Sequence, residues 1–197
     1  TAVVGGPGDN NGAGATWVFV RKNGSWSQHG GKLFGDGGEG SGYQGRSVAI
    51  SRDGSTIIVG GTNDGGDTGA AWVFVRSGDN WIQQGPRLVG GNATYKANQG
   101  TSVALSYDGN TALVSGSGDS VNIGATWVFV RSGGVWTQQG EKLVGSGVSM
   151  KSWQGASVAL SGDGNTAVIG GAADSTEIGA VWVFVRNGDA WSQQGDK

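Results

Sequence analysis

Aspartates recur at one fixed place in this sequence, in the loops that follow short apolar runs. They lie 55 residues apart and are Asp9, Asp64, Asp119 and Asp174. A carboxylate at a repeated position can hold a cation such as calcium, or it can accept hydrogen bonds that close its own loop. Calcium takes about six to eight oxygen ligands, and few other carboxylates accompany each aspartate. The pattern favours loop closure. Calcium remains the alternative, and no other cofactor or metal is expected.

Groups suited to nucleophilic or acid–base catalysis are scarce. The chain contains no cysteine and a single histidine, His29, which stands where the other repeats have glutamine. A serine nucleophile would therefore have His29 as its one candidate base. No pair of carboxylates is set apart from the repeat. We expect that the protein is not an enzyme and has no catalytic residues.

Tryptophans near the starts of four polar segments could bind a ligand by stacking on sugar rings. The alternative is a structural role, because tryptophan carries a large apolar surface with one polar group. The four residues are Trp26, Trp81, Trp136 and Trp191.

Three stretches of equal length vary strongly between repeats, namely residues 36–43, 91–98 and 146–153. Drift of this kind is typical of unconstrained surface loops. It is also compatible with loops that gather on one rim and contact a partner. The side chains in these stretches that suit a partner or ligand are Tyr43, Tyr95, Lys96, Lys151 and Trp153.

Two glycosylation sequons occur, one beginning at Asn23 and the other at Asn92. Both fall in expected turns or loops, where a glycan can be accommodated. They have meaning only if the chain passes through a suitable secretory pathway.

Charge and hydropathy disfavour two classes of partner. The formal net charge is −2, which is not the basic balance needed to track a phosphate backbone, so nucleic acid is not expected. No apolar run approaches the roughly 18 residues of a membrane helix, so membrane insertion is not expected either.

The elements that position these residues form a tandem repeat. The pentapeptide Trp-Val-Phe-Val-Arg occupies residues 17–21, 72–76, 127–131 and 182–186, each start 55 residues after the last (72−17). A fixed period of this size is the signature of a repeat architecture. The 42 glycines also sit at fixed places in the repeat, which identifies them as turn residues.

Each full unit contains four segments with strand character and none with helical periodicity. In one unit these are residues 47–50, 56–59, 72–76 and a segment that starts at Trp81. Asp53-Gly54 and its repeats separate the first two strands. Such a pair predicts a tight hairpin with positive φ at both turn positions. The sequence therefore predicts an all-β chain.

The third strand has two apolar faces, since Trp17 and Phe19 alternate with Val18 and Val20. A sheet with one wet side would not alternate in this way. The first strand contains small residues, and the fourth strand contains polar residues after its tryptophan, as expected for inner and outer strands. The pattern predicts a propeller-like array of four-stranded antiparallel blades, with an open β superhelix of the same blades as the alternative.

The ordered motifs Gly-x-Ser-Val-Ala, Asp-Gly, Val-x-Gly-Gly, Gly-Ala-x-Trp-Val-Phe and Trp-x-Gln-Gln-Gly-x-Lys-Leu resemble the FG-GAP repeat. This is the blade of integrin-α-like β-propellers, and the match is nearest to the bacterial extracellular variant. The Phe-Gly that names the family is Gln-Gly here, at Gln44, Gln99 and Gln154. These glutamines are expected to tie down backbone between blades. The short Asp-Gly hairpins lack the alternating acids of integrin calcium loops, so calcium is not transferred to them.

Dividing the chain by the period gives one partial and three full units. Residues 1–32 form a three-strand blade, and residues 33–87, 88–142 and 143–197 form full blades, which makes fifteen strands. The absent strand is an inner one. An unpaired strand edge is an association site, so we expect self-association, a filament, or a longer parent chain.

The sequence thus predicts a non-catalytic structural or adhesive protein that self-associates through blade edges and loops. A glycan or a surface protein is a further candidate partner. The resemblance implies a location outside the cell or on its surface. The alternative function is a carbohydrate-binding propeller lectin with one weak site per blade.

Overall fold

A computed structural model describes residues 1–94, 96–148 and 151–197. Within these residues, fifteen strands form four antiparallel sheets, as the sequence predicts. The first sheet contains β1 (Ala2–Gly6), β2 (Ala15–Lys22) and β3 (Ser25–Gln28). The second contains β4 (Ser47–Ile50), β5 (Thr56–Gly61), β6 (Ala70–Ser77) and β7 (Asn80–Gln83). The third contains β8 (Gln99–Leu105), β9 (Thr111–Gly116), β10 (Ala125–Ser132) and β11 (Val135–Gln138). The fourth contains β12 (Gln154–Leu160), β13 (Thr166–Gly171), β14 (Ala180–Asn187) and β15 (Ala190–Gln193).

The sheets share one topology and one register. Strands pair in sequence order within each sheet, so β4 lies at one edge and β7 at the other. Trp72 pairs with Val59, and Trp127 pairs with Val114 at the same place in the next sheet. The chain is therefore a propeller-like array of repeated blades.

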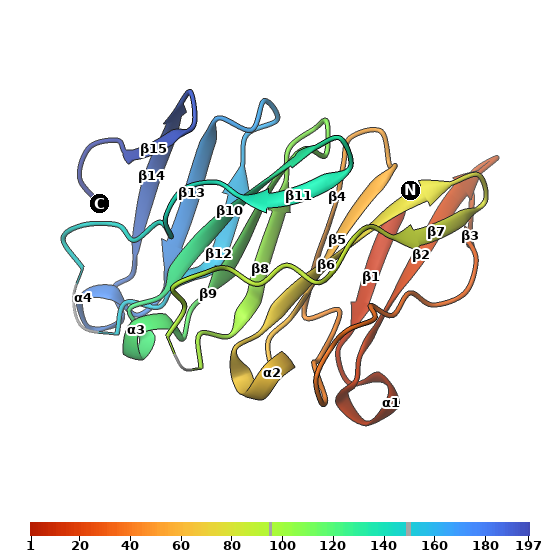
Figure 1. Cartoon of the computed structure of the whole chain (residues 1–197), viewed down its shortest axis with the longest axis horizontal. Helices are drawn as coiled ribbons and strands as arrows, with labels where there is room; N and C mark the ends of the chain where they lie inside the picture. The colour runs from red at the N-terminus through yellow and green to blue at the C-terminus, as the bar shows by residue number, and fades with distance from the viewer. Residues whose placement is uncertain (95, 149–150) are drawn as a thin grey trace.

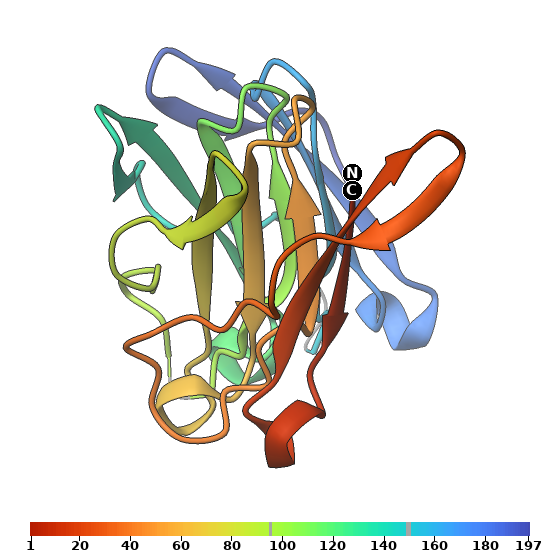
Figure 2. The same ribbon diagram turned by 90° about the vertical axis from the view of Figure 1, so that its right-hand side faces the viewer.

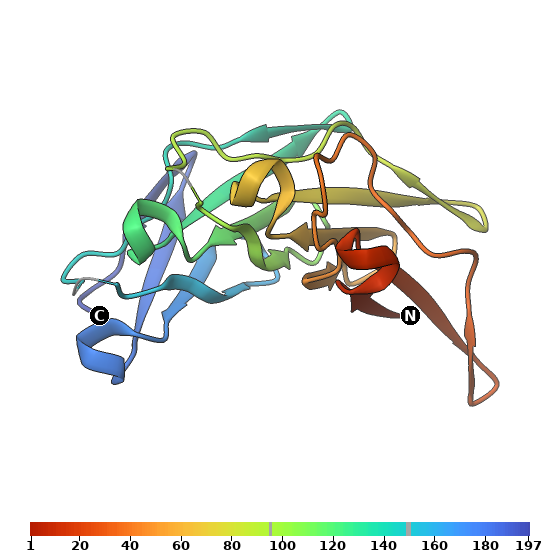
Figure 3. The same cartoon turned by 90° about the horizontal axis from the view of Figure 1, so that it is seen from below.

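The four sheets stand face to face along an arc. The inner strands β4, β8 and β12 contact one another in that order, and β1, which holds the repeat position of β5, contacts β4. The two termini lie at opposite ends of the arc (Figures 1 and 3). Seen from the N-terminal side, the first sheet stands in front of the others (Figure 2). Each interior sheet therefore has a neighbour on both faces, whereas the first and last sheets have one neighbour each.

The core lies between the sheets, and it explains why the third strand is apolar on both faces. Trp72 and Phe74 of β6 belong to one cluster, with Val18 of the first sheet. Val73 of the same strand belongs to the next cluster, with Trp127 of the third sheet. Successive side chains of a strand point to opposite faces, so one strand contributes to two layers of core.

The Asp-Gly hairpins are longer than the two-residue turns that the sequence predicts. Gly54 has φ 70°, but Asp53 is not among the residues with positive φ. The Gly54 amide donates to the carbonyl of Ser51, and the carboxylate of Asp53 accepts the Ser51 hydroxyl at 2.6 Å. This side-chain bond holds a wider turn in which only glycine needs the left-handed region.

The loop between the second and third strands is a single tight turn in every sheet. These turns are α1 (Asp9–Gly12), α2 (Asp64–Asp67), α3 (Asp119–Asn122) and α4 (Asp174–Glu177). They lie along one edge of the molecule, the lower edge in Figure 1. Two consecutive residues of each are left-handed, and in α3 one of them is Val121 at φ 58°. No helix among the described residues is long and apolar enough to cross a membrane.

Candidate functional site

The repeated aspartates form ion pairs within the edge that carries α1 to α4. Each carboxylate meets a lysine or arginine 23 residues later, at the end of its own unit. The pairs are Asp9–Lys32, Asp64–Arg87, Asp119–Lys142 and Asp174–Lys197. The sequence predicts bonds that close each aspartate's own loop, whereas Asp64 accepts the amide of Glu39, in the variable stretch 36–43, at 2.6 Å. Asp119 accepts the Thr94 amide at 2.7 Å.

Asp119 shows the electrostatics of these pairs. Burial raises the pKa of its carboxyl, but hydrogen bonds from Lys142 and from the Thr94 amide outweigh this, so the pKa lies below its usual value. Among the described residues, no group of three or more His, Cys, Asp or Glu side chains could hold a metal. The carboxylates thus pair with cationic side chains of their own chain.

The variable loops contribute exposed aromatic and basic side chains to the same edge. Tyr43 and Trp153 hold one repeat position, and both are left-handed and exposed. The amide of Trp153 donates to the carbonyl of Asn122, the last residue of α3. Lys151 is exposed, and Lys96 pairs with Asp67 at 3.5 Å. Tyr95 lies outside the described residues.

The four tryptophans of the outer strands are not presented as an exposed ring. Trp26 is 54% exposed, whereas the other three are half-buried between sheets. The Trp136 indole donates to Oε1 of Gln84 in the preceding sheet at 3.1 Å. Arg131 donates to the same oxygen and lies 5.2 Å from the centre of the Trp136 ring. Trp191, Gln139 and Arg186 repeat the arrangement. Trp136 and Trp191 therefore join adjacent sheets.

The junction between the first and second sheets lacks this bond. His29 stands at the repeat position of Gln84, since the His29 amide donates to Val18 as the Gln84 amide donates to Val73, both at 2.8 Å. His29 Nε2 and Trp81 Nε1 are both buried, and neither has a hydrogen-bond partner among the described residues. An unpaired buried polar atom costs free energy, so this junction is weaker than the next.

His29→Gln is expected to raise the free energy of unfolding by about 1 kcal/mol. The new amide oxygen would accept the Trp81 indole proton as Gln84 accepts that of Trp136. Urea denaturation measures the change. The reciprocal variant, Gln84→His, is expected to lower stability by a similar amount. Equal stability of both variants and the wild type would contradict the assignment.

Asn23 and Asn92, the sequon asparagines, are exposed and left-handed. Asn23 lies in the turn between β2 and β3. The Asn92 side chain donates to Glu141 at 2.8 Å. Both remain predicted acceptors for a glycan.

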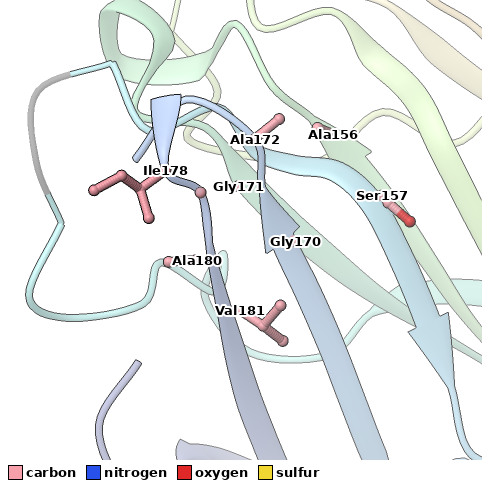
Figure 4. A pocket seen from close by; sticks show the side chains of 9 residues that line it. Ala156, Ser157, Gly170, Gly171, Ala172, Ile178, Ala180 and Val181 are labelled. Carbon is pink, nitrogen blue, oxygen red and sulfur yellow. The ribbon is translucent and has the colours of Figure 1, made fainter. Parts of the chain in front are cut away.

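The face of the last sheet that has no neighbour is the clearest open surface. Val181 is 52% exposed, although the residues at its repeat position, Thr16, Ala71 and Thr126, are each 0% exposed. Val168 of β13 is also exposed, as is Ile178, which lies between α4 and β14. A hollow of about 450 Å³ lies there (Figure 4). Its lining is Ala156, Ser157, Gly170, Gly171, Ala172, Ile178, Gly179, Ala180 and Val181. We call this surface the C-terminal face.

The first sheet has a corresponding open face, which we call the N-terminal face. Val4 is 51% exposed there, whereas Val59 and Val114 at its repeat position are buried. Trp17 and Phe19 are half-buried. The Trp72 indole donates to the Asp36 carbonyl, but no acceptor for Trp17 Nε1 lies among the described residues. The sequence motifs do not identify the residues of either face. Alignment of the repeats does identify the first and last units, which carry these faces.

Comparison with known proteins does not assign a family. No family model matches the sequence, and no curated protein matches it. Among solved structures, a TolB-like protein from Agrobacterium tumefaciens is similar, with 13% identity and a TM-score of 0.46. The similarity covers 92% of this chain and 58% of that structure, so the chain spans less than two thirds of its length.

Proposed function

We propose that this chain is a non-catalytic structural or adhesive repeat protein that self-associates through the open faces of its end sheets. The observation that carries the proposal is the exposure of Val181, at a repeat position that is fully buried in every other sheet. Apolar surface of this kind gains free energy when another surface covers it.

The two faces differ from each other, which bears on the assembly. The N-terminal face presents Val4, Trp17 and Phe19, and the C-terminal face presents Val168 and Val181. Contact between unlike faces is heterologous, and it makes a ring if the rotation closes and a filament if it does not. The resemblance to FG-GAP repeats supports a location outside the cell or on its surface.

Val181→Asp is expected to weaken self-association at least about tenfold, because a carboxylate would be buried without a partner. Sedimentation velocity over a range of concentrations measures the effect. Val135→Asp is the matched control, since Val135 is 63% exposed at the start of β11 and away from both faces. A wild-type protein that sediments as a single chain at every concentration would overturn the proposal.

A further inference from the structure

The hollow on the C-terminal face lies where each interior junction holds chain from the following unit. At the first three junctions, a glycine at the start of the third strand forms a parallel bridge with the glutamine of the next Gln-Gly pair. The bridges are Gly14–Gln44, Gly69–Gln99 and Gly124–Gln154. Gly179 holds this position in the last sheet and lines the hollow.

Backbone groups at each interior junction hold the incoming segment at two places. Ala71 exchanges two backbone bonds with Leu88, at 3.0 and 2.7 Å, and Thr68 accepts the Gln99 amide at 2.8 Å. Val181 and Ile178 hold the repeat positions of Ala71 and Thr68, at the edge of the hollow. The last sheet thus presents the same backbone edge to an incoming chain.

Glycine makes room for the segment at the interior junctions. In the second sheet, a Cβ on Gly60 would overlap the carbonyl of Gly100, so the backbone there leaves no room for a side chain at position 60. Ser115 holds the equivalent position in the third sheet, where its hydroxyl donates to the Gly155 carbonyl at 2.6 Å. Gly170 holds this position in the last sheet, and the nearest atom to a Cβ there is the Ser157 carbonyl oxygen at 3.6 Å.

The serine of the inner strand completes the arrangement. The Ser47 hydroxyl donates to the Gly100 carbonyl at 2.8 Å, and the Ser102 hydroxyl accepts the Val158 amide at 3.2 Å. Ser157 is the equivalent residue of the last sheet, and no hydrogen-bond partner for its hydroxyl lies among the described residues. It lines the hollow together with Gly170.

We infer that the C-terminal face is a preformed acceptor for the leading segment of another repeat unit. The segment has the pattern Leu-x-Gly, then eight variable residues, then Gln-Gly-x-Ser-Val-Ala, as in residues 88–104. The inference rests on the proposed function, because it takes the open face to be a contact surface. It adds the chemical identity of the peptide segment that this face binds.

The segment that binds must not already be held between two sheets. In this chain, the three segments that begin at Leu33, Leu88 and Leu143 are all bound between sheets. A folded second copy therefore has none free within the described residues, and its N-terminal face would meet the C-terminal face without this segment. Binding of the free segment is thus separable from self-association of folded copies.

The test uses the whole chain and a synthetic peptide of residues 88–105 with a fluorescent label at its N-terminus. Fluorescence anisotropy is expected to show saturable binding. A second peptide carries a photoreactive residue in place of Val89, which is exposed and next to Leu88. Cross-linking and mass spectrometry are expected to place it on β13 and β14, near Val181. Binding located only on the first sheet would overturn the inference.

Two host variants and a control sharpen the result. Gly170→Val is expected to weaken binding at the C-terminal face at least tenfold, whereas Gly170→Ser, which copies Ser115, is expected to retain it. Gly31→Val is the control, since a Cβ on Gly31 meets nothing within 4 Å. Equal cross-linking to the wild type and Gly170→Val would overturn the inference.

Sedimentation of the same samples separates the two proposals. If folded copies associate and the peptide does not bind β13 and β14, the inference fails while the proposed function stands. If the peptide binds and the chain alone stays a single chain, the proposed self-association fails while the acceptor site stands.

Discussion

Trp127→Ala is expected to lower the free energy of unfolding by about 3–5 kcal/mol. The Trp127 side chain is 0% exposed, and its indole donates to the Gly91 carbonyl at 2.7 Å. The substitution would remove a large ring from the cluster that joins the second and third sheets. It would also leave the Gly91 carbonyl without its donor. Urea denaturation at a protein concentration below the onset of association is the measurement.

Trp17→Ala provides the matched control, because Trp17 holds the same repeat position on the N-terminal face. Its ring is half-buried, and no acceptor for its indole lies among the described residues. The expected loss is smaller, about 1–2 kcal/mol, in proportion to the apolar area that becomes exposed. If the two variants lose the same stability, the end sheets are covered in solution or the ring of Trp127 is less buried than the structure shows.

Gln99→Leu is expected to cost about 3 kcal/mol, the second largest effect. Gln99 is fully buried, and its side chain makes two bonds to one residue. Its Oε1 accepts the Gly90 amide at 2.6 Å, and its Nε2 donates to the Gly90 carbonyl at 3.0 Å. Leucine has nearly the same volume, so the loss reports the two unpaired backbone groups of Gly90 and not a cavity. Thermal and urea denaturation both measure it.

Gln28→Leu tests whether the loss of stability depends on the burial of the two bonds between Gln99 and Gly90. The Gln28 side chain is exposed and donates to the Gly30 carbonyl at 2.9 Å. Its replacement is expected to change stability by less than about 0.5 kcal/mol, as is typical of surface positions. A loss at Gln99 no greater than the loss at Gln28 would show that Gly90 finds other partners, such as water.

Several elements could be predicted from the sequence because they depend on local pattern. The alternation of Trp72 and Phe74 with Val73 requires a strand that is buried on both faces, and the structure places these residues in two clusters. The glutamines of the Gln-Gly pairs were expected to tie down backbone, and Gln99 does so at Gly90. These interactions lie within one unit or between adjacent units, so they repeat with the sequence.

Other features could not be read from the pattern because they depend on atoms that meet only in space. The pairing of Asp119 with Lys142 joins residues 23 positions apart across a loop. The tryptophans of the outer strands were considered as a sugar-stacking ring, yet Trp136 bonds to Gln84 of the preceding sheet. The sequences around Gln84 and His29 are similar. Only the packing shows that the Trp81 indole has no hydrogen-bond partner among the described residues, whereas the Trp136 indole bonds to Gln84.

By itself, the sequence determined the period, the four strands of a full unit and the count of fifteen, because hydrophobic alternation and turn residues act locally. Only the tertiary structure decided which copies of a repeated residue are buried. Val181 and Thr126 hold the same place in their units, yet one is 52% exposed and the other is 0% exposed. The physical reason is that burial of a sheet face depends on the neighbouring sheet, so residues in equivalent positions form core between two sheets and are exposed where no sheet of the structure covers them.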